Sequence, residues 1–187
     1  MFLPGFQKDS FDPGEKGKNI KKYLENEGWQ VEISEYGNRM PMTEHLSKYG
    51  EQVKIELESF KASAIIAHSM GGLVAQEALR KTQMTIKKLI MLETPNQGIP
   101  RWALKIGILP DWSSTRCMIK NSDFLRQIRK TDERETLYYQ IGGFYSVLLP
   151  KTFISPEIPT KIFKTITHSG LRSNLRVLKE ILKILES

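Results

Sequence analysis

The residues from Ala64 to Leu73 form the pattern with the clearest chemical meaning in this chain. They read Ala-Ile-Ile-Ala-His-Ser-Met-Gly-Gly-Leu, so an apolar run typical of a strand leads through Ser69 into a helical pattern. A serine on such a tight turn needs small residues two positions before and after it, because the strand and helix backbones pass close together. Ala67 and Gly71 occupy these positions. The pattern predicts a nucleophile elbow with Ser69 as nucleophile, against the alternative of a structural turn serine.

A serine nucleophile needs a base within hydrogen-bonding distance and usually an acid that orients this base. Of the three histidines, His68 precedes Ser69 and must point away from it, so we expect a packed structural role. His45 stands at the start of an expected helix, where a solvated or capping role is typical. His168 follows the last expected strand and precedes the last expected helix, the place of the base when serine, acid and histidine follow in that order. We therefore predict His168 as the base, the alternative being a loop histidine without a role.

The elements that must position these residues follow from hydrophobic periodicity. Strand and helix signals alternate along most of the chain, which predicts a parallel sheet covered by helices on both faces. The expected strands are residues 2–3, 29–33, 62–67, 86–92, 137–141 and 161–167. The expected helices are residues 14–27, 46–60 and 70–81 and a last helix capped by Ser173, with Leu175, Leu178, Ile181, Leu182 and Leu185 facing the core. We predict about six strands and five or more helices in one domain that spans residues 1–187.

Between Glu93 and about Glu133 the regular alternation stops. The stretch from Ile99 to Trp112 combines glycine and proline with several large apolar residues, and it lies just after a Pro-Asn turn beside the expected mouth of the site. These side chains would line an acyl pocket, form a short mobile lid, or simply pack a loop onto the core. The sequence leaves these three alternatives open.

Length and composition restrict the class of protein. A chain of 187 residues is long enough for one domain with a sizeable core. The net charge is +7, but the basic residues are scattered over helical faces, which argues against nucleic-acid binding. Cys117 is the single cysteine, which excludes an internal disulfide and any multi-cysteine metal site. We find no apolar run long enough for an integral membrane segment and no signal-peptide pattern, so we expect a cytoplasmic protein.

Taken together, the motifs resemble those of the α/β-hydrolase lipases and esterases, especially the small bacterial lipases with an Ala-x-Ser-x-Gly elbow. The resemblance covers nearly the whole chain and rests on four segments, which are Pro4-Gly5-Phe6, Ala67 to Leu73, Glu93-Thr94-Pro95-Asn96-Gln97-Gly98 and His168-Ser169-Gly170-Leu171. It implies a minimal α/β-hydrolase fold with a mostly parallel sheet, helices on both faces and no large cap domain. It also implies that no cofactor and no metal take part.

The same resemblance assigns the oxyanion hole to the backbone N–H groups of Phe6 and Met70. Such donors stabilise a tetrahedral intermediate by roughly 3 kcal/mol each. Pro4 departs from the family pattern, because a histidine usually precedes the glycine of this loop. Since the donor comes from the backbone of a later residue, we expect Pro4 to change the rigidity of the loop more than its chemistry.

The acid is the larger departure. In the small lipases an aspartate follows the next-to-last strand of the sheet, and here Tyr145 occupies that place, with no carboxylate between Glu135 and Glu157. Glu93 is the alternative, because it ends the strand after the elbow helix, as the acid does in pancreatic-type lipases. From there a carboxylate reaches the histidine Nδ1 from a neighbouring strand end. The remaining possibilities are a dyad without an acid, or an acid at Glu157, Asp111 or Asp123.

These residues predict a serine carboxylic-ester hydrolase that forms an acyl-enzyme on Ser69, with His168 as base, Glu93 as acid and a small-molecule ester or lipid as substrate. Two alternatives use the same fold. The missing aspartate and Pro4 favour a catalytically weak relative that serves as a binding module. An acyltransferase, in which an alcohol replaces water, would use the same serine and histidine.

Overall fold

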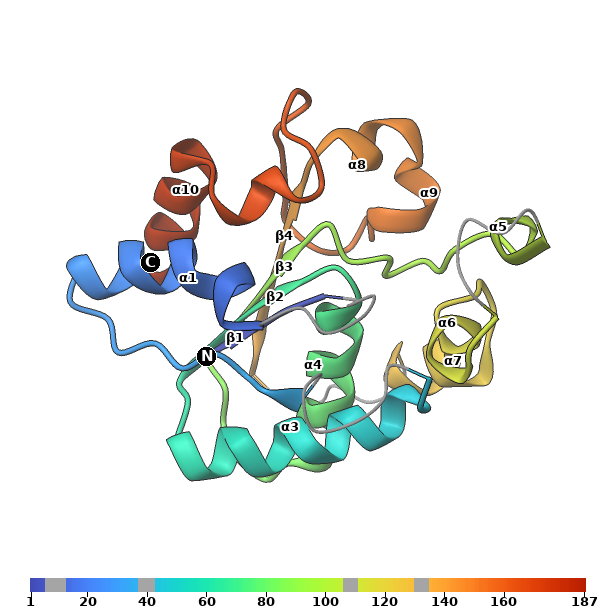
Figure 1. Cartoon of the computed structure of the whole chain (residues 1–187), viewed down its shortest axis with the longest axis horizontal. Helices are drawn as coiled ribbons and strands as arrows, with labels where there is room; N and C mark the ends of the chain where they lie inside the picture. Colours follow the sequence, from blue (N-terminus) through green and yellow to red (C-terminus); the bar gives the residue numbers. More distant parts are fainter. Residues whose placement is uncertain (6–12, 37–42, 106–110, 130–134) are drawn as a thin grey trace.

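The sheet contains five parallel strands whose spatial order follows the order of the chain (Figure 1). The computed structural model describes residues 1–5, 13–36, 43–105, 111–129 and 135–187. The strands are β1 (Phe2–Leu3), β2 (Ala64–His68), β3 (Lys88–Leu92), β4 (Leu137–Gly142) and β5 (Thr160–Ile162). Because every neighbouring pair is parallel, the carboxyl ends of the strands share one edge of the sheet. The loops that leave these strands meet at that edge.

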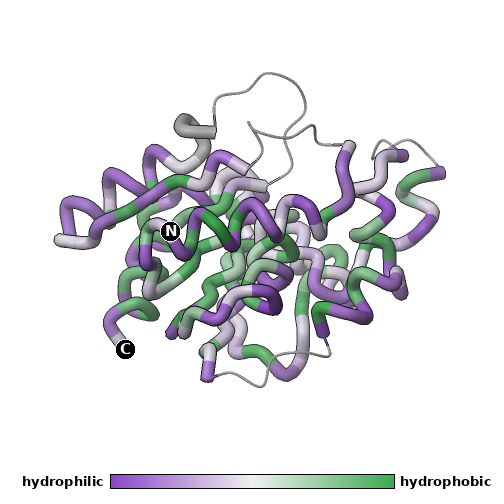
Figure 2. The backbone as a smooth tube through the Cα atoms, turned by 90° about the horizontal axis from the view of Figure 1, so that it is seen from below, coloured by the Kyte–Doolittle hydropathy of each residue, from purple (hydrophilic) through white to green (hydrophobic). Residues whose placement is uncertain are grey.

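Helices cover both faces of the sheet, as predicted. The two layers are α1 (Pro13–Asn26) with α10 (Leu175–Glu186) on one face, and α3 (Leu46–Phe60) with α4 (Met70–Lys81) on the other (Figure 1). Residues of β2 alternate between the layers, since Ile65 and Ala67 pack with α3 and α4 whereas Ile66 packs with α1 and α10. Figure 2 shows apolar segments gathered in the interior and hydrophilic segments along the outer helices. The predicted α/β class is confirmed.

In the described part of the chain, the connections after β3 and β4, and the one from β5 to α10, contain only short helices. No large cap domain is present in this part. After β3 these are α5 (Trp102–Lys105), α6 (Ser113–Cys117) and α7 (Asp123–Arg129). After β4 and β5 they are α8 (Phe144–Leu148), α9 (Pro150–Phe153) and the 3₁₀ helix η1 (Gly170–Arg172). None of the described helices is long and apolar enough to cross a membrane.

The prediction of about six strands needs a correction. Of the expected strand 29–33, only Ile33 pairs with the sheet, through a parallel bridge to Phe2. Two hydrogen bonds make this bridge, from Phe2 N to Glu32 O (2.8 Å) and from Ser34 N to Phe2 O (2.9 Å). Since β1 is only two residues long, residues 29–33 pair with it at this one bridge and form no strand.

Two predictions at the C-terminal end of the chain were also wrong. The last strand ends at Ile162 rather than Thr167, because the chain turns where Ile166 N donates to Phe163 O (3.0 Å). The N-cap of α10 is Asn174 rather than Ser173, and its side chain accepts from Arg176 N (3.0 Å). This cap leaves Leu175 outside the core, with 55% of its surface exposed.

Candidate active site

Ser69 lies on the sharp turn between β2 and α4. Its backbone has φ 55° and ψ −128°, a positive φ that residues other than glycine rarely adopt. The Ser69 side chain makes no capping bond to α4, so the hydroxyl is not used to begin the helix. The first N–H groups of a helix lack intrahelical partners, and Met70 is the first residue of α4. The turn therefore places a strained serine directly before a helix N-terminus.

The glycines near Ser69 also make room for the segment that leaves β1. A Cβ on Gly71 would lie 2.5 Å from the Pro4 carbonyl oxygen, and a Cβ on Gly5 would lie 2.7 Å from Ser69 Cβ. The segment that comes close to the turn is thus the one leaving β1. Tyr36 helps to fix this segment, because its buried hydroxyl donates to the Pro4 carbonyl (2.5 Å). Phe6, the expected second oxyanion donor, lies outside the described residues.

The structure brings Glu93 and His168 together. Glu93 directly follows β3, and its Oε2 lies 2.8 Å from His168 Nδ1. A carboxylate accepts, so Nδ1 is the nitrogen that donates, and a neutral imidazole then keeps the lone pair on Nε2. Glu93 is 2% exposed whereas the His168 side chain is 26% exposed. The carboxylate is therefore buried beneath a histidine whose side chain remains partly exposed.

The second carboxylate oxygen of Glu93 is held by the loop after β4. Oε1 accepts from the backbone N–H groups of Gly143 (3.0 Å) and Ser146 (2.7 Å) at the start of α8. A Cβ on Gly143 would lie 2.6 Å from the Ile166 carbonyl oxygen and 3.3 Å from Glu93 Oε1, so only glycine fits without a shift. The sequence analysis missed this role, although the Gly142-Gly143 pair directly after a strand was a usable signal.

Two opposing effects act on the pKa of Glu93. Burial raises the pKa of the carboxyl, but the hydrogen bond from His168, the two backbone N–H donors and the charge of His168 together outweigh burial and hold the pKa below its ordinary value. The carboxylate is thus anionic at neutral pH. Glu93 also has a positive φ of 46°, an unfavourable backbone conformation for a non-glycine residue that is maintained by its surroundings.

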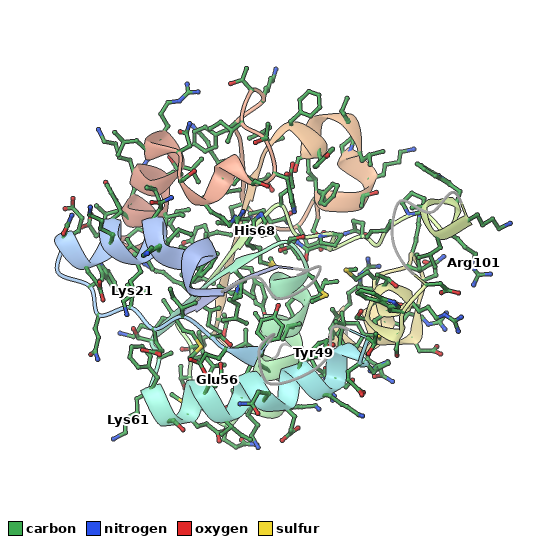
Figure 3. The ribbon with its side chains drawn as sticks, viewed as in Figure 1. Lys21, Tyr49, Glu56, Lys61, His68 and Arg101 are labelled. Atoms are coloured by element: carbon green, nitrogen blue, oxygen red, sulfur yellow. The ribbon has the colours of Figure 1, made fainter. Side chains whose placement is uncertain are left out.

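His68 has a contact with His168 that the sequence did not reveal. It is buried, as expected, and its Nε2 donates to the His168 backbone carbonyl (2.9 Å), while the two rings lie 4.4 Å apart between centroids. Figure 3 shows His68 in the middle of the molecule. Because His68 adjoins Ser69 in the chain, this contact ties the loop that carries His168 to the turn that carries Ser69. The third histidine, His45, caps α3 by accepting from Ser47 N (3.2 Å).

The other carboxylates considered as acids lie elsewhere or have other partners. Asp111 forms two hydrogen bonds with Arg116 (2.7 and 2.8 Å), and Asp123 pairs with Arg126. Glu157 is exposed beside the start of β5. Within the ranges that the structure describes, Glu93 alone among them bonds to His168. No group of three or more potential ligands that could hold a metal ion occurs among the described His, Cys, Asp and Glu side chains.

Tyr145 occupies the place where a small lipase would carry its aspartate. The residue is 46% exposed, and the centroid of its ring lies 5.8 Å from that of His168 and 6.5 Å from that of Phe153, on which it stacks. A phenol in this position contributes an apolar and aromatic wall beside the histidine rather than a negative charge.

Comparison with solved structures identifies the architecture. The chain aligns with an extracellular α/β-hydrolase from a Paenibacillus species with a TM-score of 0.61, at 11% identity, over 98% of this chain and 97% of that one. It aligns equally well with the Bacillus licheniformis lipase BlEst2 (TM-score 0.61, 15% identity, 98% and 89% coverage). The chain has the α/β-hydrolase fold. At these identities the likeness extends to the fold alone.

A third similar structure is the phospholipase PlaB from Legionella pneumophila, solved in complex with thio-NAD. The TM-score is 0.54 at 16% identity, over 76% of this chain, and the aligned part spans only 36% of the length of the phospholipase. No protein-family model matches the chain, and the comparison with curated proteins gave no match.

In the α/β-hydrolase fold of this chain, Ser69, Glu93 and His168 follow β2, β3 and β5, at the edge where the carboxyl ends of the strands meet.

Proposed function

We propose that the protein is a serine carboxylic-ester hydrolase with Ser69 as nucleophile, His168 as base and Glu93 as acid. The observation that carries this proposal is the 2.8 Å contact between Glu93 Oε2 and His168 Nδ1. It orients the imidazole so that Nε2 can accept a proton, which is the tautomer that a serine nucleophile requires. The missing aspartate and Pro4 had favoured a catalytically weak relative that serves as a binding module, and the position of Glu93 weakens the first of these two reasons.

In the proposed first half-reaction, His168 Nε2 takes the proton of Ser69 while Oγ attacks the ester carbonyl carbon. The resulting oxyanion would accept from the N–H of Met70 at the start of α4 and from a second backbone donor, for which Phe6 is the candidate. The tetrahedral intermediate then collapses. The C–O bond to the alcohol breaks, the alcohol leaves with the proton from His168, and an acyl-enzyme remains on Ser69.

In the second half-reaction a water molecule takes the place of the alcohol. His168 removes a proton from this water as it attacks the acyl carbon, and the carboxylic acid leaves when Ser69 regains its proton. In both halves the imidazolium forms next to the buried, anionic Glu93 carboxylate, which stabilises its charge. The described residues show no hydrogen bond between the Ser69 hydroxyl and His168, and in serine enzymes this bond commonly tightens only when substrate binds.

The test is labelling with a fluorophosphonate probe, combined with hydrolysis of p-nitrophenyl esters. We expect the full chain to be labelled at Ser69, and we expect Ser69→Ala and His168→Ala each to lower turnover by at least ~10³-fold. Labelling that persists in Ser69→Ala, or turnover equal to that of the wild type, would refute the proposal. A matched control is Ser59→Ala, because Ser59 is an exposed serine of α3 far from the elbow.

A further inference from the structure

A cationic cleft lies next to α5 and α6, in the stretch that the sequence analysis left without a role. We refer to it as the basic cleft. Its volume is about 480 Å³, and its described lining includes four basic residues and one acidic residue, which are Arg101, Lys105, Arg116, Lys120 and Asp111. All five side chains belong to exposed residues. The cleft is thus an open feature bordered by charged side chains.

Among the described residues, the positive charge of the basic cleft is neutralised only at Arg116. Asp111 is held by Arg116 through two hydrogen bonds, and this pair is neutral as a whole. In the described parts of the chain, no carboxylate forms an ion pair with Arg101, Lys105 or Lys120. Residues 106–110 lie outside the described part, and their sequence, Ile-Gly-Ile-Leu-Pro, contributes no charge. The cleft therefore suits an anionic ligand.

Apolar residues accompany the basic ones. Trp102, next to Arg101, has 49% of its surface exposed, and the partly buried Leu104 lines the cleft. A tryptophan beside exposed arginines and lysines is typical of surfaces that insert into the headgroup region of a bilayer, where the ring meets the apolar boundary and the cations meet phosphates. A site for single-stranded nucleic acid would instead combine the basic patch with several aromatic side chains on which bases stack.

The basic cleft and the candidate active site flank the same stretch of chain. Gln97 N donates to Thr152 O in α9 (2.9 Å), and two residues later Ile99 N donates to Met118 O (2.8 Å) while Lys120 N donates to Ile99 O (2.9 Å). On the α9 side, α8 and the residue after it expose the apolar residues Phe144, Tyr145, Leu148 and Leu149, of which Tyr145 lies against the His168 ring. Figure 3 shows Arg101 at the periphery beside α5. Residues 97–99 thus connect the apolar residues around α8 to the cationic face that the basic cleft and Trp102 form.

We propose that this face docks on an anionic phospholipid surface, with headgroup phosphates in the basic cleft and Trp102 at the boundary of the acyl chains. This proposal rests on the proposed hydrolase function, because docking would present lipid esters to Ser69. It adds the chemical class of the partner, which is an anionic phospholipid surface. Its test measures binding and needs no turnover. A failure of ester hydrolysis and a failure of docking are therefore distinguishable.

The experiment is co-sedimentation of the full chain, carrying Ser69→Ala, with vesicles of phosphatidylcholine alone or mixed with phosphatidylglycerol. We expect much stronger binding to the mixed vesicles. The double variant Arg101→Glu/Lys105→Glu should lower the partition coefficient on them by at least ~10-fold, since each basic residue near an anionic surface contributes to binding. Trp102→Ala should weaken binding further. Thermal unfolding checks that each variant is folded, and Lys105→Gln/Lys120→Gln gives a milder version of the same test.

The matched control is Arg176→Glu/Lys179→Glu on α10, which changes the net charge by the same amount at exposed positions. In Figure 1, α10 and α5 lie at opposite ends of the molecule. We expect this control to bind mixed vesicles almost as well as the parent. Equal binding to both kinds of vesicle would overturn the proposal, and so would an equal loss in the control. Binding of inorganic phosphate without vesicle binding would overturn it in favour of a free phosphate compound.

Discussion

The ends of two neighbouring strands, β3 and β4, share the task of holding a negative charge beside His168. The end of β3 supplies the charge itself, the Glu93 carboxylate on a backbone with positive φ. The end of β4 supplies no acidic side chain, but the N–H groups of Gly143 and Ser146 bind that carboxylate. In this chain the charge beside His168 thus comes from one strand end, and backbone donors to that charge come from the other.

The comparison is tested most strongly by removing the charge. Glu93→Gln keeps the size of the side chain, but an amide can hold the wrong imidazole tautomer and cannot stabilise the imidazolium, so we expect kcat to fall by ~10²–10⁴-fold. Hydrolysis of p-nitrophenyl esters measures this. Tyr145→Phe is the matched control at the end of β4 and should change kcat far less. An unchanged kcat in Glu93→Gln would mean that a Ser–His dyad is sufficient.

The next test removes the support from β4 while leaving the charge in place. Gly143→Ala fits the local backbone, which has φ −115°, but its Cβ would meet the Ile166 carbonyl and crowd Glu93 Oε1. We expect kcat to fall roughly tenfold, because the carboxylate loses its fixed orientation, and stability to fall by ~1–3 kcal/mol. Urea unfolding and ester hydrolysis measure the two effects. A loss of stability with full kcat would show that the N–H donors do not serve the acid.

The pH dependence of stability distinguishes what the charge of Glu93 contributes to folding from what the size and shape of its side chain contribute. Because the folded-state pKa is lowered, the carboxylate contributes stability above its unfolded-state pKa of about 4.3. This contribution is lost as the pH falls through the folded-state value. Wild-type Tm should therefore fall more steeply on acidification than the Tm of Glu93→Gln, and the two curves should converge at low pH. Parallel curves from neutral to acidic pH would contradict the direction of the shift.

The smallest effect is expected at His68, which acts on the position of His168 rather than on its charge. His68→Ala removes one hydrogen bond of ~1 kcal/mol to the His168 carbonyl, so kcat should fall about fivefold with little change in KM. His68→Gln retains a donor and should restore most of the loss. A shifted pH profile of kcat in His68→Ala would indicate an electrostatic role instead, and equal kcat in all three proteins would exclude both.

Much of the fold was predictable because it rests on side-chain periodicity. The strand before Ser69 and the helix after it lie within two residues of their predicted bounds. The edge of the sheet was less predictable, since residues 29–33 have a strand pattern, yet the short β1 leaves room for one bridge only. Ser173 and Asn174 are both good capping residues. Ser173 belongs to the end of η1, where its N–H donates to Gly170 O (3.1 Å), so α10 is capped by Asn174.

In the candidate site, the side chains could be proposed from the sequence, whereas the Ser146 N–H that binds Glu93 could not. Glu93 was a candidate because Tyr145 stands at the expected position of the acid and because Glu93 ends the strand after the elbow helix, where the resemblance to pancreatic-type lipases implies an acid. The N–H of Ser146 carries no signature, because every residue except proline has one. The contact of His68 with His168 depends on how two loops fold across each other, which the pattern of a single sequence does not encode.

The match between strand order and chain order has a consequence for synthesis on the ribosome. Each strand pairs with one already made, so the sheet can grow from β1 to β5 as the chain emerges. The proposed nucleophile and acid, at residues 69 and 93, emerge long before His168. A nascent chain would thus carry most of its core and an inert serine, and hydrolytic activity would be the last property it acquires.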